Sequence, residues 1–358
     1  MARSHDMTSG SIWRSLLGFS IPIMISNLVQ STYNAVDMLF VGRFTGTESL
    51  AAVSVCGPIL NVMIITLSGM SAGVLVVISG LLGAGDIKQA QDAAHTSVAL
   101  YALMAAVMTV LGLLFVPQIL RLVQTPAASM PEAKRYLYTV FAGTVFTFGY
   151  NLIGALQRGL GNAAASMSFV IISSAANIAL DAVFIVWLGM GAFGAALGTV
   201  LSQVAAFVIG TVQFARGGAA LRLSARAVRF HKKHLKNILL FGVPTALNEV
   251  MVNLAMLTVS GVANSFGLAS SAAYGVGSRI NSLAIFTDGA MNQTMSAYAS
   301  QNIGAGRQKR ALEGLWKAII LSAGAALGTS LLVLGFASEF SACFDSDPAV
   351  IEQSAAFL

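Results

Sequence analysis

Four acidic residues lie within long apolar stretches of the chain: Asp37, Asp181, Glu249 and Asp288. A charge in such surroundings costs much free energy, so each acid is a candidate for a functional role. Asp37 follows Tyr33 by one helical turn. Asn177 precedes Asp181 by four residues, which places both on one face of a helix. Thr199 lies at a similar depth in the next apolar stretch, so these polar groups could share one site.

The chemistry available to Asp37 and Asp181 is the binding of a proton or a small cation. Two carboxylates in a pocket of low dielectric constant repel each other, so we expect one of them to hold a proton near neutral pH. Sodium could bind the same oxygens instead. The alternative is a structural role, in which these groups only tie helices together by hydrogen bonds.

A second set of residues could line a cavity for a small molecule: Asn151, Glu249, Asp288, Arg279 and Met256. Methionine at helical spacing is more often packing filler than a cavity lining. An ion pair between Arg279 and one of the acids, which would brace the neighbouring helices, is as consistent with the sequence as a binding site. No base and nucleophile lie at a shared depth, so we do not expect an enzyme.

Composition shows which elements must position these residues. Of 358 residues, 56% are hydrophobic and 9% are charged, and the mean hydropathy is +0.78. A soluble domain of this length would carry about a quarter charged residues, so the solvent for most of the chain must be the bilayer. Two cysteines, Cys56 and Cys343, are too few for a disulfide framework or a metal cluster. We therefore expect an all-α polytopic membrane protein without a bound cofactor.

The apolar stretches predict about nine transmembrane helices, since about 20 residues are needed for each crossing. They lie at 15–41, 49–82, 95–119, 134–157, 166–188, 192–214, 237–263, 268–302 and 315–338. With the N-terminus in the cytoplasm, 15 basic residues fall on the inner side and four on the outer side. This bias predicts a multi-pass protein of the cell's inner membrane with a cytoplasmic N-terminus.

One long basic connector, at 216–236, separates an N-terminal part at 1–215 from a C-terminal part at 237–358. We interpret it as a cytoplasmic linker that anchors the topology. A patch for lipid headgroups or nucleic acid is the alternative. Because its charge fits membrane orientation, we do not expect nucleic acid as a partner. The partners that we expect are membrane lipid and a small molecule, and we expect a monomer.

The two parts are related by an internal repeat. Gly83–Ala90 aligns with Gly304–Ala311 at an offset of 221 residues, and Pro22 aligns with Pro244 after a slip of one. A unit of six helices is even, so both units enter the membrane from the same side. The offset also predicts that the second unit stops after three helices, so that the chain is a truncated form of a twelve-helix protein. The repeat places Val259 opposite Asp37, with no carboxylate there.

Several short motifs in this order resemble the multidrug and toxic compound extrusion (MATE) family. They are Pro22, Tyr33-Asn-Ala-Val-Asp37, Phe40-Val-Gly-Arg43, Ser79-Gly-Leu-Leu-Gly-Ala-Gly85, Ala155-Leu-Gln-Arg-Gly-Leu-Gly161 and Ser300-Gln-Asn-Ile-Gly-Ala-Gly306. The sequence looks closest to the bacterial DinF-like branch. The resemblance implies two pseudo-symmetric six-helix lobes around a central cavity that opens alternately to either side, with the second lobe incomplete here.

The resemblance also implies a function, namely export of cationic or amphiphilic compounds in exchange for protons or sodium. It assigns the coupling ion to the polar cluster of Tyr33, Asp37, Asn177, Asp181 and Thr199. A flippase for lipid-linked saccharides is one alternative, but its cavity should be cationic, whereas this chain has four intramembrane acids against Arg279. An inactive truncated membrane product is the other alternative.

Overall fold

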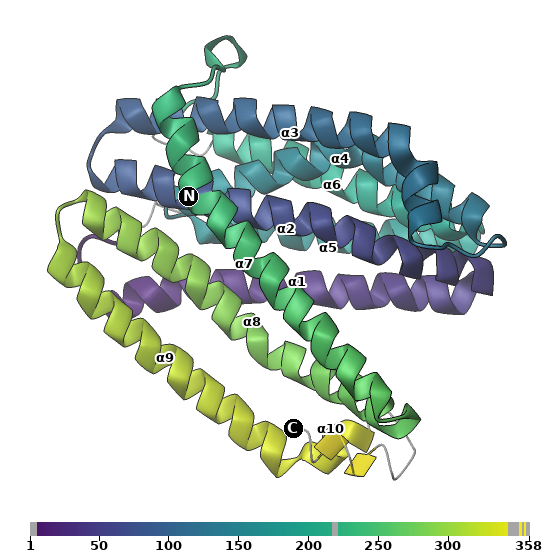
Figure 1. Cartoon of the computed structure of the whole chain (residues 1–358). Helices are drawn as coiled ribbons and strands as arrows, with labels where there is room; N and C mark the ends of the chain where they lie inside the picture. The colour runs from purple at the N-terminus through teal and green to yellow at the C-terminus, as the bar shows by residue number, and fades with distance from the viewer. Residues whose placement is uncertain (1–5, 217–220, 343–350, 353, 356–358) are drawn as a thin grey trace.

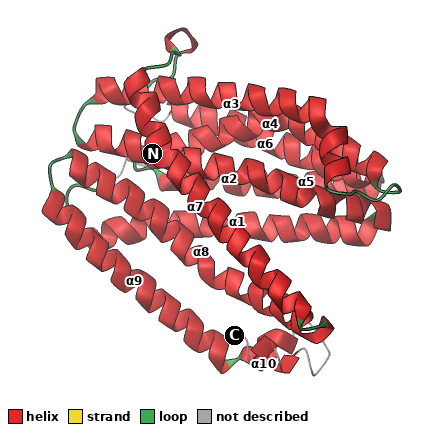
Figure 2. Cartoon of the chain, viewed as in Figure 1, coloured by secondary structure: helices red, strands yellow, loops and turns green. Residues whose placement is uncertain are grey.

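The computed structural model describes residues 6–216, 221–342, 351, 352, 354 and 355, and only the backbone at 225, 268–271 and 279–287. The described part of the chain is helical, without strands (Figure 2). Its helices are α1 (Ile12–Phe44), α2 (Thr47–Gly83), α3 (Ile87–Leu122), α4 (Met130–Gly159), α5 (Ala163–Asp181), the π-helical turn η1 (Ala182–Trp187), α6 (Gly191–Arg216), the 3₁₀ turn η2 (Ala225–Ala227), α7 (Lys232–Ser265), α8 (Leu268–Gly304), α9 (Gln308–Gly335) and α10 (Ala337–Ala342).

Each of the nine predicted apolar stretches coincides with one of the long helices of the described chain. Among the described residues, eight helices are long and apolar enough to cross a membrane: α1 to α4, α5 with η1, α6, α7 and α9. α8 is long enough at 37 residues but is more polar, because serines, amides and a carboxylate interrupt its apolar residues. The fold is therefore that of an all-α polytopic membrane protein.

The helices form two groups, which we call the first lobe (α1–α6) and the second lobe (α7–α9). Within the first lobe, α4 packs against α2, α3 and α6, and α5 packs against α1 and α6. In the second lobe α8 lies between α7 and α9, and these three helices slope away from the first lobe toward α10 (Figure 1). We call the end of the bundle where α1 starts and where α7 starts the linker end, and the opposite end the far end.

The turns at the linker end show why the helices stop there. α2 and α8 both end in a Gly-Ala-Gly sequence, and the last glycine of each, Gly85 and Gly306, has a φ of +72° and +71°. This left-handed conformation ends a helix and favours glycine. The Asp86 side chain then accepts a hydrogen bond from the Gln89 backbone N–H at 3.0 Å and caps α3. The two repeat units thus share a backbone turn at equivalent positions.

Glycines bring the two lobes into direct backbone contact along α2. A Cβ on Gly73 would overlap the carbonyl oxygen of Ile238 in α7, and one on Gly83 would overlap that of Gln301 in α8. Reciprocally, a Cβ on Gly304 would overlap the carbonyl oxygen of Gly80. We call this contact of α2 with α7 and α8 the seam. It closes the linker-end half of the boundary between the lobes, since only glycine permits backbones to approach so closely.

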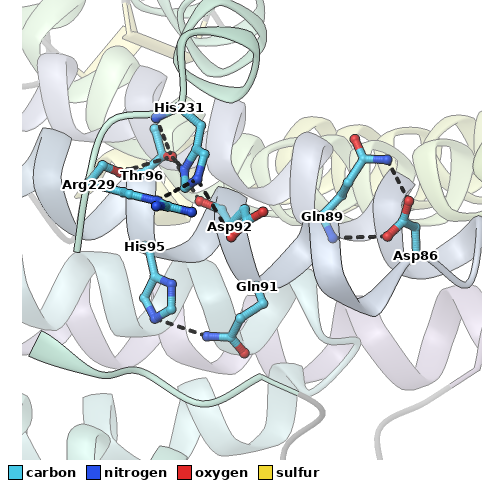
Figure 3. A network of polar contacts seen from close by, with 8 residues as sticks. All are labelled: Asp86, Gln89, Gln91, Asp92, His95, Thr96, Arg229 and His231. Atoms are coloured by element: carbon cyan, nitrogen blue, oxygen red, sulfur yellow. Dashed lines mark hydrogen bonds and ion pairs between the residues drawn. The ribbon is translucent and has the colours of Figure 1, made fainter. Parts of the chain in front are cut away.

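The connector between α6 and α7 is fastened to the first turns of α3 (Figure 3). Gln91 Oε1 accepts a hydrogen bond from the Arg222 N–H at 2.7 Å, and Thr96 Oγ1 accepts one from the His231 N–H at 3.2 Å. Arg229 Nε donates to His231 Nε2 at 2.9 Å, and Lys233 Nζ donates to Gln89 Oε1 at 2.8 Å. The described part of the basic connector is therefore docked on the first lobe.

Candidate functional site

The first-lobe acids lie on two helices that pack together. Asp37 is in the far-end half of α1, and Asp181 is the last residue of α5 before the π-helical turn η1. α1 contacts both α5 and η1. The carboxyl groups of Asp37 and Asp181 are close enough to interact electrostatically. The structure therefore brings these two predicted site residues together.

Burial without hydrogen bonds distinguishes this cluster. Asp181 is 0% exposed and Asn177 is 1% exposed. Neither carboxylate oxygen of Asp181 and neither polar atom of the Asn177 amide has a hydrogen-bond partner among the described residues, and the same holds for Asp37 Oδ1. Buried polar groups in proteins are nearly always paired, because an unpaired one costs free energy. The structural alternative, in which these groups tie the helices by hydrogen bonds, is not what the described residues show.

Local backbone structure explains how Asp181 is held. A Cβ on Gly198 of α6 would overlap Asp181 Oδ1, so the carboxylate occupies the space that a larger residue would take. One turn earlier, a Cβ on Gly194 would lie 3.1 Å from the Phe184 carbonyl oxygen in η1. The π-helical turn that starts at Ala182 is a feature often found at functional sites. The Gly194–Gly198 spacing thus lets α6 approach α5 closely, at the acid.

The remaining first-lobe candidates are placed around this pair. Tyr33 is half-buried and interacts electrostatically with Asp37, Asp181 and Tyr150. Thr199 is half-buried on α6, directly after Gly198. Asn151 is half-buried on α4, where its Nδ2 donates to the Thr147 carbonyl at 2.8 Å.

Sequence reasoning missed two residues of this site. Tyr136 of α4 is buried and lies within electrostatic range of Asp37, Cys56, Tyr33 and Asp181. Gln30 Nε2 donates to the Tyr150 hydroxyl at 3.4 Å and so joins α1 to α4 near Tyr33. A buried tyrosine on a helix next to an acid-bearing helix is the signal that could have found Tyr136. The spacing of Tyr136 from the acids along the chain gives no such signal.

The second-lobe candidates do not form a comparable cluster in the described chain. Glu249 of α7 accepts a hydrogen bond at 2.6 Å from the Ser68 hydroxyl of α2, so it faces the first lobe across the seam. Asp288 is exposed and lines a groove between α8 and α9, together with Met291 and Asn292. Met256 is 46% exposed on α7. The side chain of Arg279 lies outside the described part, and so does the ion pair considered for it.

The first-lobe arrangement has the chemistry of a cation or proton site. Two carboxylates and an amide oxygen are the hard oxygen ligands that ions such as sodium and calcium take. Asp181 is fully buried with both oxygens unpaired, and the half-buried Asp37 has one unpaired oxygen within electrostatic range of it, so a proton or a cation at this pair would relieve their repulsion. The second-lobe acids lack this combination in the described chain, because Asp288 is exposed and Glu249 has a hydroxyl donor.

Comparisons with known proteins show which family the chain resembles. The chain is 29% identical over 308 residues to the probable multidrug resistance protein YpnP of Bacillus subtilis. This match covers 86% of this chain and 69% of YpnP. It is 30% identical over 319 residues to YoeA of the same organism, a probable multidrug resistance protein, covering 86% and 68%.

A solved structure of a multidrug resistance MATE family transporter of the MOP superfamily, in its outward-facing conformation, matches with a TM-score of 0.92. The sequence identity is 25%, and the match covers 99% of this chain and 80% of that chain. The family model MatE matches residues 22–183 and 244–358, which together are most of the chain. The chain therefore belongs to the MatE family of transporters.

Proposed function

We propose that this chain exports cationic or amphiphilic small molecules in exchange for protons or sodium ions, and that the first-lobe cluster holds the coupling ion. The observation that carries the proposal is the Asp181 carboxylate, which is 0% exposed and has no hydrogen-bond partner for either oxygen among the described residues. A buried acid that costs stability and ties nothing together fits a functional role better than a structural one. Asp37 and Asn177 extend the site by two further unpaired groups.

The coupling ion would alternate between the two sides of the membrane with the lobes. Asp37 and Asp181 would load a proton or sodium from one side, and movement of the second lobe against the first would change access and release it. Antiport requires that the ion and the cargo bind with unequal affinity in the two states. Tyr33, Thr199 and Tyr136 lie around the acids and would set the shape and depth of the ion site.

We also propose that the protein lies in the inner membrane of the cell and that its linker end faces the cytoplasm. The support is charge: the described connector at that end carries exposed Arg222, Arg226, Arg229, Lys232 and Lys233. Cytoplasmic loops carry such an excess of lysine and arginine, next to the anionic inner leaflet. The protein would act as a monomer surrounded by lipid.

The charge of the intramembrane groups favours a cationic cargo over an anionic one. Asp37 and Asp181 lie in the first lobe, and Glu249 faces the seam from the second. Carboxylates attract ammonium-type drugs, whereas a flippase for lipid-linked saccharides would need cationic groups to hold pyrophosphate. The flippase remains the second candidate only if no cation is moved.

The test is efflux of ethidium from energised cells. The chain is expressed with and without three further helices at its C-terminal end, and each form is compared with its Asp37→Asn variant at equal expression. Export that Asp37→Asn abolishes supports the proposal. If no form moves dye under a proton or a sodium gradient, the multidrug proposal is wrong.

A further inference from the structure

A short segment that precedes α1 is held between the lobes. Met7 is 0% exposed, although it lies before the first helix. Its side chain belongs to an apolar cluster that includes Leu16 of α1, Leu75 of α2 and Tyr298 of α8. Figure 1 shows the start of α1 at the linker end, where α8 ends and α9 starts. We call residues 6–10 the strap.

The second lobe binds the strap through its backbone. The Met7 N–H donates to Gln301 Oε1 at 2.9 Å, and Asn302 Nδ2 donates to the Met7 carbonyl at 3.2 Å. Arg310 of α9 donates from Nη2 to the Ser9 carbonyl at 2.9 Å, and Arg307 donates from Nη1 to the Thr8 carbonyl. Gln301 and Asn302 are themselves buried. The two amide bonds lie in buried surroundings and the two arginine bonds come from charged donors, and both conditions strengthen a hydrogen bond.

The partners of the strap lie where the internal repeat breaks. At the 221-residue offset Gln301 and Asn302 correspond to Gly80 and Leu81, so the first unit has no amide at either position. The glycine turn after α8 matches that after α2, with Gly306 and Gly85 both at positive φ. The second unit therefore keeps the glycine turn of the first unit but differs from it in Gln301 and Asn302, the two side chains that hydrogen-bond the Met7 backbone.

Local contacts shape the strap and orient the arginine that binds it. The Asp6 carboxylate accepts hydrogen bonds from the Thr8 hydroxyl at 2.6 Å and the Ser9 hydroxyl at 2.9 Å, and these hold the pKa of Asp6 below its usual range. The guanidinium of Arg310 lies over the Tyr298 ring, 5.9 Å from its centroid. The Tyr298 hydroxyl donates to the Arg310 carbonyl at 3.2 Å. The Tyr298 ring thus helps to orient Arg310 toward the strap.

We propose that the strap is a latch that keeps the linker end closed, because Met7 and its backbone bind α8 and α9 of the second lobe while α1 belongs to the first. The strap spans the same end as the seam, where Gly80 and Gly83 meet α8. Opening of the linker end must break the contacts of the strap and those of the seam. The inference rests on the proposed function in one respect, namely that the lobes separate here during transport. Release of the strap then sets how often the linker end opens.

The experiment measures opening directly and needs no transport. A single cysteine, Ser300→Cys, is placed at the seam in a background with Cys56→Ser and Cys343→Ser, and its rate of reaction with a bulky maleimide is measured in detergent. Ser300 is half-buried, and a Cβ on Gly80 would lie 3.9 Å from its Cβ. This matches the Cβ–Cβ spacing of about 3.8 Å in disulfides, so Gly80→Cys with Ser300→Cys should cross-link when the seam is closed.

Arg310→Ala should raise the labelling rate of Ser300→Cys about tenfold, the shift expected when one charge-assisted contact is lost from the closed state. Met7→Ala should act in the same direction. Lys309→Ala, an exposed neighbouring cation, is the matched control and should leave the rate unchanged. Arg310→Lys keeps the charge but not the forked donor, and should give an intermediate rate.

A labelling rate in Arg310→Ala and Met7→Ala equal to that of the parent overturns the latch. A rise of the same size in Lys309→Ala also overturns it, because the effect would then be one of net charge. If Arg310→Ala does not elute as a folded monodisperse protein, Met7→Ala carries the test. A chain that exports no dye still reports opening through this label, so failure of the latch and failure of the transport proposal are distinguishable.

Discussion

The two lobes share a backbone design but differ in where they place charge. In the first lobe Asp181 is fully buried and unpaired, and it lies beside Asp37. In the second lobe Asp288 is exposed, and the repeat sets Val259, 48% exposed, at the position of Asp37. A duplicated fold can keep its helices and turns while only one copy retains an expensive internal charge. That difference supports the proposal that the first lobe holds the coupling ion while the second lobe moves against it.

Asp181→Asn should have the largest effect. It keeps the size of the side chain but removes the charge, so efflux should fall at least about tenfold, within the 5- to 150-fold that coupling free energies represent. Thermal stability should stay the same or increase, because a buried unpaired carboxylate is replaced by a neutral group. Ethidium efflux and thermal unfolding of the purified variant check both. Loss of stability together with loss of transport would instead favour a structural role for Asp181.

Gly198→Ala should have the next largest effect. The added methyl group would overlap Asp181 Oδ1, and overpacking of this kind costs about 1–3 kcal/mol. We expect efflux to fall severalfold and the pH dependence of efflux to shift, since the carboxylate must move. Efflux is measured as a function of external pH at equal expression.

The matched control for Gly198 is in the second lobe. A methyl group added to Gly261 of α7 would have nothing within 4 Å among the described residues, so Gly261→Ala should be neutral or stabilise the helix by up to about 1 kcal/mol. If both substitutions lower efflux without moving its pH profile, Gly198 has only a packing role and the asymmetry between the lobes loses one support.

The sequence was sufficient for part of this picture. Asp37, Asn177 and Asp181 stood out because they are polar within apolar runs, and the four-residue spacing put two of them on one face. The Gly-x-x-x-Gly spacing of Gly194 and Gly198 is typical of a close helix contact, and the structure shows α6 approaching α5 and η1 there. Local spacing carries such information because a helix repeats every 3.6 residues.

Other features depend on how separate helices meet, and the sequence could not supply them. Tyr136 on α4 lies within electrostatic range of Asp37 and Asp181, which are too far away in the sequence for a local pattern to link them. The π-helical turn after Asp181 changes the direction of the following side chains, and no sequence motif predicts this turn. Met7 lies outside every predicted helix, so its burial between the lobes was not expected. The assignment to the DinF-like branch stays a prediction.

Glu249→Gln should have a smaller effect than either first-lobe change. The Ser68 hydroxyl donates to Glu249 Oε1, and a glutamine oxygen can accept the same hydrogen bond. Loss of the charge weakens a hydrogen bond that is worth about 1.5–3 kcal/mol when one partner is ionised, so efflux should change by less than in Asp181→Asn. Glu249→Leu removes the acceptor and should be more harmful than Glu249→Gln. Equal, complete loss in Glu249→Gln would place a second essential acid in the second lobe and break the comparison.

Asp288→Asn should have the smallest effect of all. Asp288 is exposed in the groove between α8 and α9, and the described residues around it in that groove are mostly apolar. The groove leaves the Asp288 side chain outside the packed interior, so its neutralisation changes neither the burial of Asp181 nor the repulsion that loads the first-lobe site. Efflux and its pH profile should match those of the parent chain, measured beside Asp181→Asn on the same day and at the same expression. A drop as large as that in Asp181→Asn would mean that the second lobe also carries the coupling ion, and the asymmetry would then lie in the conformation of the lobes rather than in their chemistry.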